Sequence, residues 1–139
     1  MMDIEQLKSV RPLVVEDEPN MLTSLVSALG LTFDILYTAR NGEEGLYRFY
    51  KETPDVVITD LEMPFMGGFR MLERIRAENP NVPIIITSAH SADEHYEKAK
   101  HLGVDAYLPK PYDIDALIET VYDLCCLSSG KIDLDQFSV

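Results

Sequence analysis

Residues 54–68 read Pro-Asp-Val-Val-Ile-Thr-Asp-Leu-Glu-Met-Pro-Phe-Met-Gly-Gly, which combines a short apolar run with an acidic residue and a Pro/Gly turn. The β-branched run Val56, Val57 and Ile58 follows a proline and closes at an acid and a Pro/Gly turn, which is typical of a fully buried strand. Asp60 therefore lies at the carboxyl end of that strand, where open sheets covered by helices bind their ligands. Taken alone, an Asp before Pro and Gly is usually a turn former, so its importance depends on the rest of the chain.

The length and charge of the chain narrow its function. With 139 residues there is room for one domain with one sizeable core. The formal charge of −12 argues against direct nucleic-acid binding, because that affinity comes largely from Lys and Arg on phosphates. No apolar stretch is long enough to span a bilayer and the first residues lack the order of a signal peptide. We therefore expect no membrane association and a cytoplasmic protein.

The two cysteines, Cys125 and Cys126, are neighbours late in an amphipathic segment. Adjacent cysteines are poorly placed for a structural disulfide, so we expect reduced thiols that lie partly in the core. The histidines His90, His95 and His101 are not grouped at ligand spacing, which argues against a zinc site.

From residue 12 to residue 127, short β-rich runs alternate with helical stretches. The expected strands are 12–15, 34–38, 56–60, 82–88 and 104–108, and the expected helices are 19–30, 41–50, 68–77, 93–102 and 113–126. Asn41 and Asp113 are expected helix caps, and Leu46, Phe49 and Tyr50 could face the core. This alternation predicts right-handed βαβ crossovers and an α/β fold with a mainly parallel sheet covered on both faces.

We predict one folded domain over residues 11–127, preceded by an N-terminal lead at residues 1–10. Residues 128–139 have no strong hydrophobic period. They are expected to form a tail that docks Ile132, Leu134 or Phe137, or to be a truncated linker.

Several of the predicted strands end in side chains that could take part in chemistry. The first strand leads to Glu16 and Asp17, the third to Asp60, the fourth to Thr87 and Ser88, and the fifth to Lys110. If these ends converge, three carboxylates share one crevice, and their mutual repulsion requires a cation. Oxygen ligands with open positions suit Mg²⁺, which keeps several waters and recruits phosphoryl oxygens.

Four motifs carry a resemblance to a known family. They are Val14-Val15-Glu16-Asp17-Glu18-Pro19, Thr59-Asp60-Leu61-Glu62-Met63-Pro64 with Gly68, Ile85-Ile86-Thr87-Ser88-Ala89, and Tyr107-Leu108-Pro109-Lys110-Pro111. In this order and spacing the chain resembles the response regulator receiver domains of two-component signalling, over about residues 13 to 127. The resemblance implies a flavodoxin-like, doubly wound parallel sheet of strand order 2-1-3-4-5 with five helices.

The resemblance also implies a chemistry. Asp60 would accept a phosphoryl group from the phosphohistidine of a histidine kinase or phosphotransfer protein. Glu16, Asp17, Asp60 and the backbone carbonyl of Glu62 would hold Mg²⁺, and Lys110 would stabilise the phosphoryl oxygens. Because an acyl phosphate is labile, such a protein is no classical enzyme but catalyses its own phosphoryl transfer and autodephosphorylation.

The same resemblance implies which residues switch the domain and which tune the lifetime of the phosphoryl group. Ser88 occupies the family's Ser/Thr position and would donate a hydrogen bond to the phosphoryl group. Thr87 is the competing candidate, because successive strand residues face opposite sides and only one hydroxyl should point inward. Tyr107 matches the family's switch aromatic. Glu62 and His90 would border the route of attacking water and tune the phosphoryl lifetime.

No output module is recognisable in the sequence, so the expected output is binding to a downstream protein partner or output domain. The expected binding face is built by the helix at 93–102, the last strand and the helix at 113–126. That last helix contains no Arg or Lys for charged dimer contacts, which predicts a monomer or weak dimer.

Three alternatives share parts of the pattern. A flavodoxin would need a Ser/Thr/Gly-rich phosphate cradle where this chain has the acidic Glu16-Asp17-Glu18. An aspartyl phosphatase would have a second Asp two residues after Asp60, where Glu62 stands. A receiver fold used as an unphosphorylated scaffold or interaction protein would lack the phosphoacceptor Asp or the Lys, and both are present.

Overall fold

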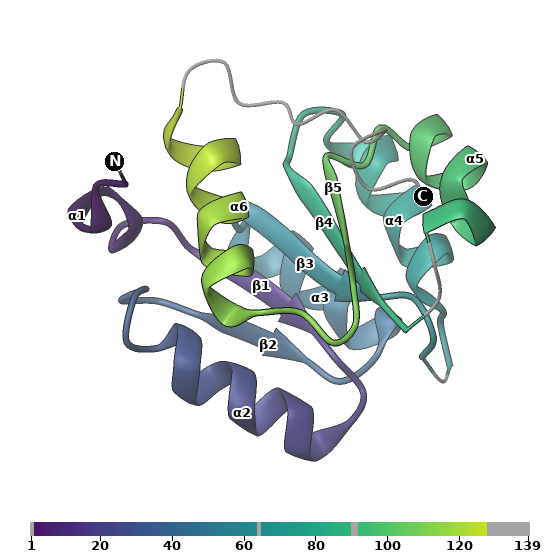
Figure 1. The fold of residues 1–139 in the computed structure, drawn as a ribbon. Coiled ribbons are helices and arrows are strands. Elements are labelled where there is room, and N and C mark those ends of the chain that lie inside the picture. Colours follow the sequence, from purple (N-terminus) through teal and green to yellow (C-terminus); the bar gives the residue numbers. More distant parts are fainter. Residues whose placement is uncertain (1, 64, 90–91, 128–139) are drawn as a thin grey trace.

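The computed structural model describes residues 2–63, 65–89 and 92–127. Its centre is a sheet of five parallel strands in the order β2-β1-β3-β4-β5 (Figure 1). The strands are β1 (Pro12–Val15), β2 (Tyr37–Ala39), β3 (Val56–Asp60), β4 (Ile84–Ser88) and β5 (Ala106–Pro109). The predicted strand order and parallel direction are confirmed.

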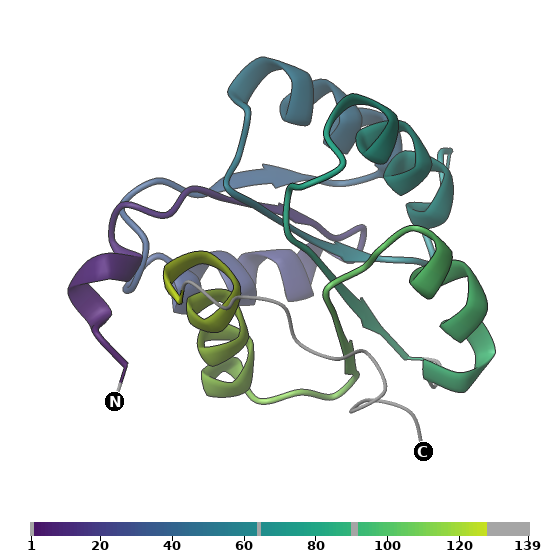
Figure 2. The ribbon, with the colours of Figure 1, turned by 90° about the horizontal axis from the view of Figure 1, so that it is seen from above.

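Helices cover both faces of the sheet. They are α1 (Ile4–Leu7), α2 (Pro19–Leu29), α3 (Gly42–Glu52), α4 (Gly68–Glu78), α5 (Ala92–His101) and α6 (Ile114–Cys126), so the described chain has six helices and not the five expected. Helices α2 and α6 lie on one face and α3, α4 and α5 on the other (Figure 2). Among the described residues, none of the helices combines the length and the apolar character needed to cross a membrane.

The core consists of one apolar cluster on each side of the sheet. Val57 belongs to the cluster under α3, α4 and α5, and its neighbour Ile58 belongs to the cluster under α2 and α6. Successive strand residues point to opposite faces, so a strand buried on both sides needs a continuous apolar run. Leu46 and Phe49 of α3 are buried as expected, but Tyr50 is 50% exposed and does not face the core.

The additional helix α1 lies in the segment predicted as a lead. Asp3 caps it by accepting a hydrogen bond from the N–H of Glu5 at 3.1 Å. Leu7 and Val10 are buried in the cluster of α2 and α6. The N-terminal segment therefore contributes to the core, although four helical residues give too little periodicity for a sequence prediction.

The strand β2 starts at Tyr37, later than the predicted start at residue 34. The N–H groups of Thr32 and Phe33 bond to the carbonyl of Leu29, which extends a turn beyond the end of α2. Phe33 is buried by this turn, whereas Ile35 remains exposed. The N–H of Asp34 then donates to the carbonyl of Lys8 at 3.2 Å, so the first residue of the predicted strand bonds outside the sheet.

Two predicted caps hold their helices. Asn41 Oδ1 accepts from the N–H of Glu44 at 2.8 Å, and Asp113 Oδ1 accepts from the N–H of Asp115 at 3.2 Å. These bonds satisfy donors that the first turn of a helix leaves unpaired. They fix the starts of α3 and α6 at the carboxyl edge of the sheet.

Cys125 and Cys126 are free and half-buried, as predicted. Burial raises the pKa of the Cys125 thiol to about 12, and the neighbouring Cys126 and Asp55 act in the same direction. Since the thiolate is the reactive form, burial favours the less reactive thiol form of Cys125.

Candidate functional site

Asp60 ends β3 and is 7% exposed. Its Oδ1 accepts hydrogen bonds from the N–H groups of Leu61 at 2.7 Å and Glu62 at 3.3 Å. Gly68 lies directly against the backbone of Asp60, because a Cβ at position 68 would stand 2.6 Å from the Asp60 carbonyl oxygen. The loop after β3 therefore holds the carboxylate in one orientation.

Three carboxylates converge at the carboxyl edge of β1 and β3. Oxygens of Glu16, Asp17 and Asp60 all lie within 4.8 Å of one another. Glu16 is almost fully buried, and its Oε2 accepts from the N–H of Glu18 at 3.1 Å. Buried carboxylates this close repel strongly unless cations compensate them.

Lys110 supplies one compensating charge. Its Nζ donates to Glu16 Oε1 and to Asp60 Oδ2, both at 2.9 Å. Burial alone would lower the pKa of Lys110, but the hydrogen bonds and the charges of these two carboxylates raise it above its ordinary value. One ammonium against three carboxylates leaves an excess of negative charge, so the oxygen donors fit a divalent cation such as Mg²⁺.

The hydroxyl candidates lie at the end of β4. Thr87 and Ser88 are both buried, and the backbone N–H of Lys110 donates to the carbonyl of Ser88 at 2.6 Å. This bond ties the end of β4 to the lysine, across a register that pairs Ser88 with Pro109. Burial does not separate the two hydroxyls, so Ser88 as the acting residue stays a prediction.

Tyr107 lies in β5 opposite Ile86 and is fully buried in the cluster under α3, α4 and α5. The side chain therefore occupies an inward position. Its part in a switch stays a prediction.

Of the two residues predicted to tune the phosphoryl lifetime, Glu62 and His90, the structure describes only Glu62. Glu62 is 59% exposed, and its Oε1 lies 3.9 Å from His95 Nε2 on α5. The His95 ring packs edge-on against Phe69 of α4. His90 lies outside the described residues, as does the predicted tail at 128–139. The contact between Glu62 and His95 was not predicted, because no sequence period links the loop after β3 to a position on α5.

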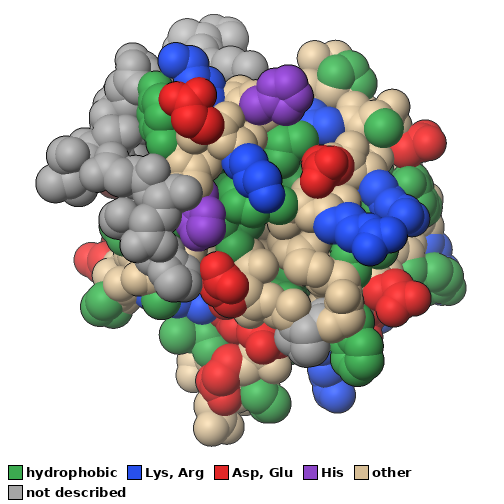
Figure 3. Space-filling model, turned by 90° about the vertical axis from the view of Figure 1, so that its right-hand side faces the viewer, with side chains coloured by type: hydrophobic (Ala, Val, Ile, Leu, Met, Phe, Trp, Pro, Cys, Tyr) green, Lys and Arg blue, Asp and Glu red, His purple; other side chains and the backbone are tan. Residues whose placement is uncertain are grey.

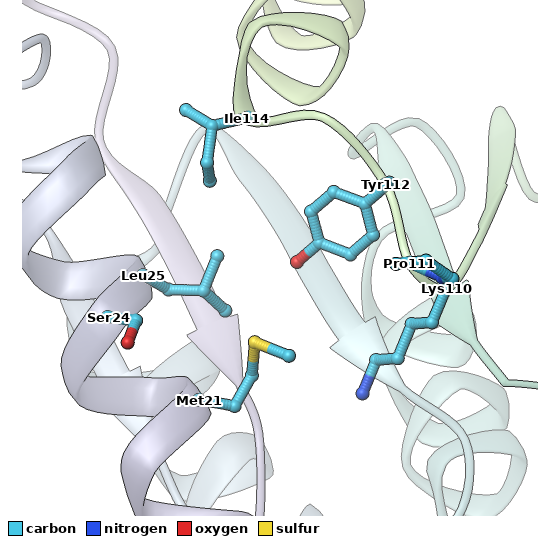
Figure 4. Close-up of a pocket in the computed structure, with 7 residues that line it drawn as sticks. All are labelled: Met21, Ser24, Leu25, Lys110, Pro111, Tyr112 and Ile114. Atoms are coloured by element: carbon cyan, nitrogen blue, oxygen red, sulfur yellow. The ribbon is translucent and has the colours of Figure 1, made fainter.

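An apolar pocket of about 150 Å³ adjoins Lys110 on the α2 side (Figure 4). Its lining residues are Met21, Ser24, Leu25, Lys110, Pro111, Tyr112 and Ile114. The Tyr112 hydroxyl is buried, points across the pocket and has no hydrogen-bond partner among the residues that the structure describes. Burial raises the pKa of Tyr112 to about 12. The bond between Lys110 and Pro111, which leads into this loop, is cis.

The family model of the response regulator receiver domain matches residues 13–122, which contain all the site residues above. The chain belongs to this family. As a receiver domain it serves phosphorylation-dependent signalling in two-component systems.

Curated relatives of this receiver domain are much longer proteins. The DNA-binding transcriptional regulator NtrC of Salmonella typhimurium is 37% identical over 108 residues, which cover 78% of this chain and 23% of NtrC. The transcriptional regulatory protein GlrR of Escherichia coli is 35% identical over 126 residues, which cover 91% of this chain and 28% of GlrR. The chain thus spans about a quarter of these relatives.

Solved structures agree with the fold. The N-terminal domain of an uncharacterized protein from Wolinella succinogenes has a TM-score of 0.78 and 38% identity, and the match covers 83% of this chain and 93% of that one. The response regulator TrrA of Thermotoga maritima, solved in complex with Mg²⁺ and BeF, has a TM-score of 0.73 and 34% identity, with 81% and 96% covered.

Proposed function

We propose that Asp60 of this receiver domain accepts a phosphoryl group from the phosphohistidine of a histidine kinase or phosphotransfer protein. The observation that carries the proposal is the convergence of Glu16, Asp17, Asp60 and Lys110 at one edge of the sheet, with Glu16 and Asp60 buried. A rigid carboxylate beside a fixed ammonium suits phosphoryl transfer, which depends mainly on positioning and charge stabilisation.

The donor set fits Mg²⁺. Glu16, Asp17 and Asp60 would hold it together with the backbone carbonyl of Glu62, all oxygen ligands that this ion prefers. When bound, Mg²⁺ supplies positive charge to the transferring phosphoryl oxygens. The related TrrA, solved in complex with Mg²⁺ and BeF, supports this assignment.

The hydrogen bonds suggest which oxygen of Asp60 attacks. Oδ1 is engaged by two backbone N–H groups, so Oδ2 is the proposed nucleophile. The Oδ2–P bond forms as the N–P bond of phosphohistidine breaks, and the electron pair stays on the imidazole nitrogen. Lys110, 2.9 Å from Oδ2, stabilises the charge on the phosphoryl oxygens. Attack of water on the resulting acyl phosphate returns Asp60 and releases phosphate, so the domain resets itself.

The proposed response passes through Ser88 and Tyr107 to the face of α5, β5 and α6. Ser88 donates to the phosphoryl group, while Glu62 and His90 tune access of water. The side of the molecule with α4 and α5 carries hydrophobic, basic, acidic and histidine side chains close together (Figure 3). Mixed surfaces of this kind are common in transient protein interfaces, which supports binding of a downstream protein or output domain.

The proposed setting is the cytoplasm, with a histidine kinase or phosphotransfer protein upstream. Helix α6 contains no Lys or Arg, which supports a monomer or weak dimer. The net charge of −12 supports partners other than nucleic acid for this domain.

Labelling with acetyl phosphate tests the chemistry without a kinase. We expect intact mass spectra to show one added phosphoryl group that requires Mg²⁺ and disappears in Asp60→Asn. Asp55→Asn, directly before the start of the same strand, is the matched control and should label like the parent chain. An adduct that survives Asp60→Asn would contradict the proposal.

A further inference from the structure

Phe65 is a large apolar side chain that packs against almost nothing. It is 85% exposed, and its backbone φ is 64°. The left-handed region disfavours bulky residues, and burial of a phenyl ring would ordinarily offset such strain. Here neither the backbone preference nor the core accounts for a phenylalanine at this position.

Two backbone hydrogen bonds anchor the loop that contains Phe65. The N–H of Gly68 donates to the carbonyl of Leu61 at 3.1 Å, which closes the loop between β3 and α4. The N–H of Gly42 donates to the carbonyl of Met66 at 3.1 Å, which fastens the same loop to the start of α3. The exposed ring is therefore presented on a supported loop, five positions after Asp60 in the sequence.

A second apolar feature lies on the other side of the carboxylate cluster. The pocket beside Lys110 opens toward α2, on the face of α2 and α6. The loop of Phe65 leads instead into α4, which covers the opposite face. A macromolecule that brings a phosphoryl group to Asp60 from outside can thus meet apolar surface on both faces of the sheet edge.

We infer that Phe65 is a contact residue for the protein that carries the phosphohistidine, and that it makes transfer from a protein faster without affecting small phosphoryl donors. This inference rests on the proposed phosphorylation of Asp60. We assign the contact with Phe65 to the protein that carries the phosphohistidine, because a protein donor must cover the loop after β3 to reach Asp60. Acetyl phosphate is too small to bury the ring, whereas a protein surface can desolvate it, and aromatic side chains are enriched among the residues that contribute most to such interfaces.

Phe65→Asn removes the ring and keeps the backbone conformation, because Asn tolerates the left-handed region better than most residues. Phe65→Tyr keeps the aromatic surface, and Leu31→Asn removes an equally exposed side chain from the loop between α2 and β2. A panel of autophosphorylated histidine kinase cores is first tested on the parent chain, and the core that transfers fastest is chosen. Each variant is then phosphorylated by acetyl phosphate and by that core. Sedimentation of each variant is measured in parallel.

We expect Phe65→Asn to lower kcat/KM for the kinase donor at least about fivefold, with unchanged labelling by acetyl phosphate. Phe65→Tyr and Leu31→Asn should behave like the parent chain. Equal transfer from the kinase to Phe65→Asn and to the parent chain would overturn the inference. It would also be overturned if acetyl phosphate labels the parent chain but no kinase of the panel does. A loss with both donors would make Phe65 part of the site's own structure, and a change in sedimentation alone would assign the ring to self-association. Failure of both donors on the parent chain would instead contradict the proposed function.

Discussion

Lys110 compensates the two buried carboxylates of the cluster, Glu16 and Asp60. Its ammonium bridges Glu16 and Asp60 at 2.9 Å each. Since its pKa is raised in the folded chain, the stabilisation from these pairs is complete below the ordinary lysine pKa of 10.5. It is lost only as the pH rises through the raised value, so Lys110 is charged throughout the physiological range.

Lys110→Met removes the ammonium beside Asp60. We expect labelling by acetyl phosphate to fall about 100-fold, because the ammonium beside the attacking oxygen is removed. Mg²⁺ should bind more tightly in calorimetric titration, because no cation competes for Glu16 and Asp60. Lys98→Met on α5 is the control. Unchanged labelling in Lys110→Met would show that the lysine does not stabilise the transfer.

Tyr112→Phe tests a buried hydroxyl. The hydroxyl has no hydrogen-bond partner among the described residues and lies in an apolar pocket, so its removal relieves a desolvation cost. We expect urea unfolding to show a free energy equal to the parent or higher by about 1 kcal/mol. Tyr122→Phe on α6 is the matched control, for which we do not predict this effect on the free energy of unfolding. A loss of more than about 1 kcal/mol in Tyr112→Phe would reveal a partner for the hydroxyl.

At the scale of elements, Arg76 of α4 joins segments that are distant in the sequence. Its guanidinium donates to the carbonyls of Val82 at 2.6 Å, Leu102 at 2.7 Å and Gly103 at 2.9 Å. It also lies 3.4 Å from the buried carboxylate of Asp105. One side chain thereby holds the end of α4, the approach to β4 and the turn between α5 and β5.

We predict that Arg76→Met costs about 3–5 kcal/mol in urea unfolding, because Asp105 would keep a buried charge without its cation. Asp105→Asn added to Arg76→Met should recover part of the loss, since the two residues are coupled. The exposed Arg74→Met is the matched control. Additive effects of the two substitutions would contradict the coupling.

Elements with a strong period are predicted well from the sequence, and those without it are not. The cap Asn41 and the glycine at 68 set helix starts that agree with α3 and α4. The edge strand β2 starts later than predicted because the N–H of Asp34 bonds to the carbonyl of Lys8, and such a backbone bond carries no sequence period. Arg76 escapes sequence reasoning for the same reason, since its carbonyl partners have no side-chain signature.

At the scale of the whole molecule, the topology follows from connection rules. Right-handed crossovers and burial on both faces lead from alternating strands and helices to the observed sheet, and they bring the strand ends with Glu16, Asp60 and Lys110 to one edge. Tertiary packing alone decides that Lys110 bridges two particular carboxylates, that the Tyr112 hydroxyl meets no partner among the described residues and that Phe65 stays exposed. Those features depend on side-chain geometry between elements.

Mg²⁺ should stabilise the entire domain. Folding brings three carboxylates together, so the ion binds the folded chain in preference to the unfolded one. At tenfold excess over its Kd, Mg²⁺ should add about 1.4 kcal/mol to the free energy of unfolding. Asp17→Asn should lose most of this gain. An equal gain from NaCl at matched ionic strength would indicate screening and not a site.

Identification of the phosphorylated residue is the decisive test of phosphoryl transfer to Asp60. The chain is labelled with acetyl phosphate and Mg²⁺ and reduced with borohydride, which converts an aspartyl phosphate into homoserine. Peptide sequencing by mass spectrometry then reads position 60. Homoserine at Asp60, and at no other aspartate, is the predicted result. Homoserine at another position, or an intact Asp60 in chains that carry the phosphoryl group, would contradict the account.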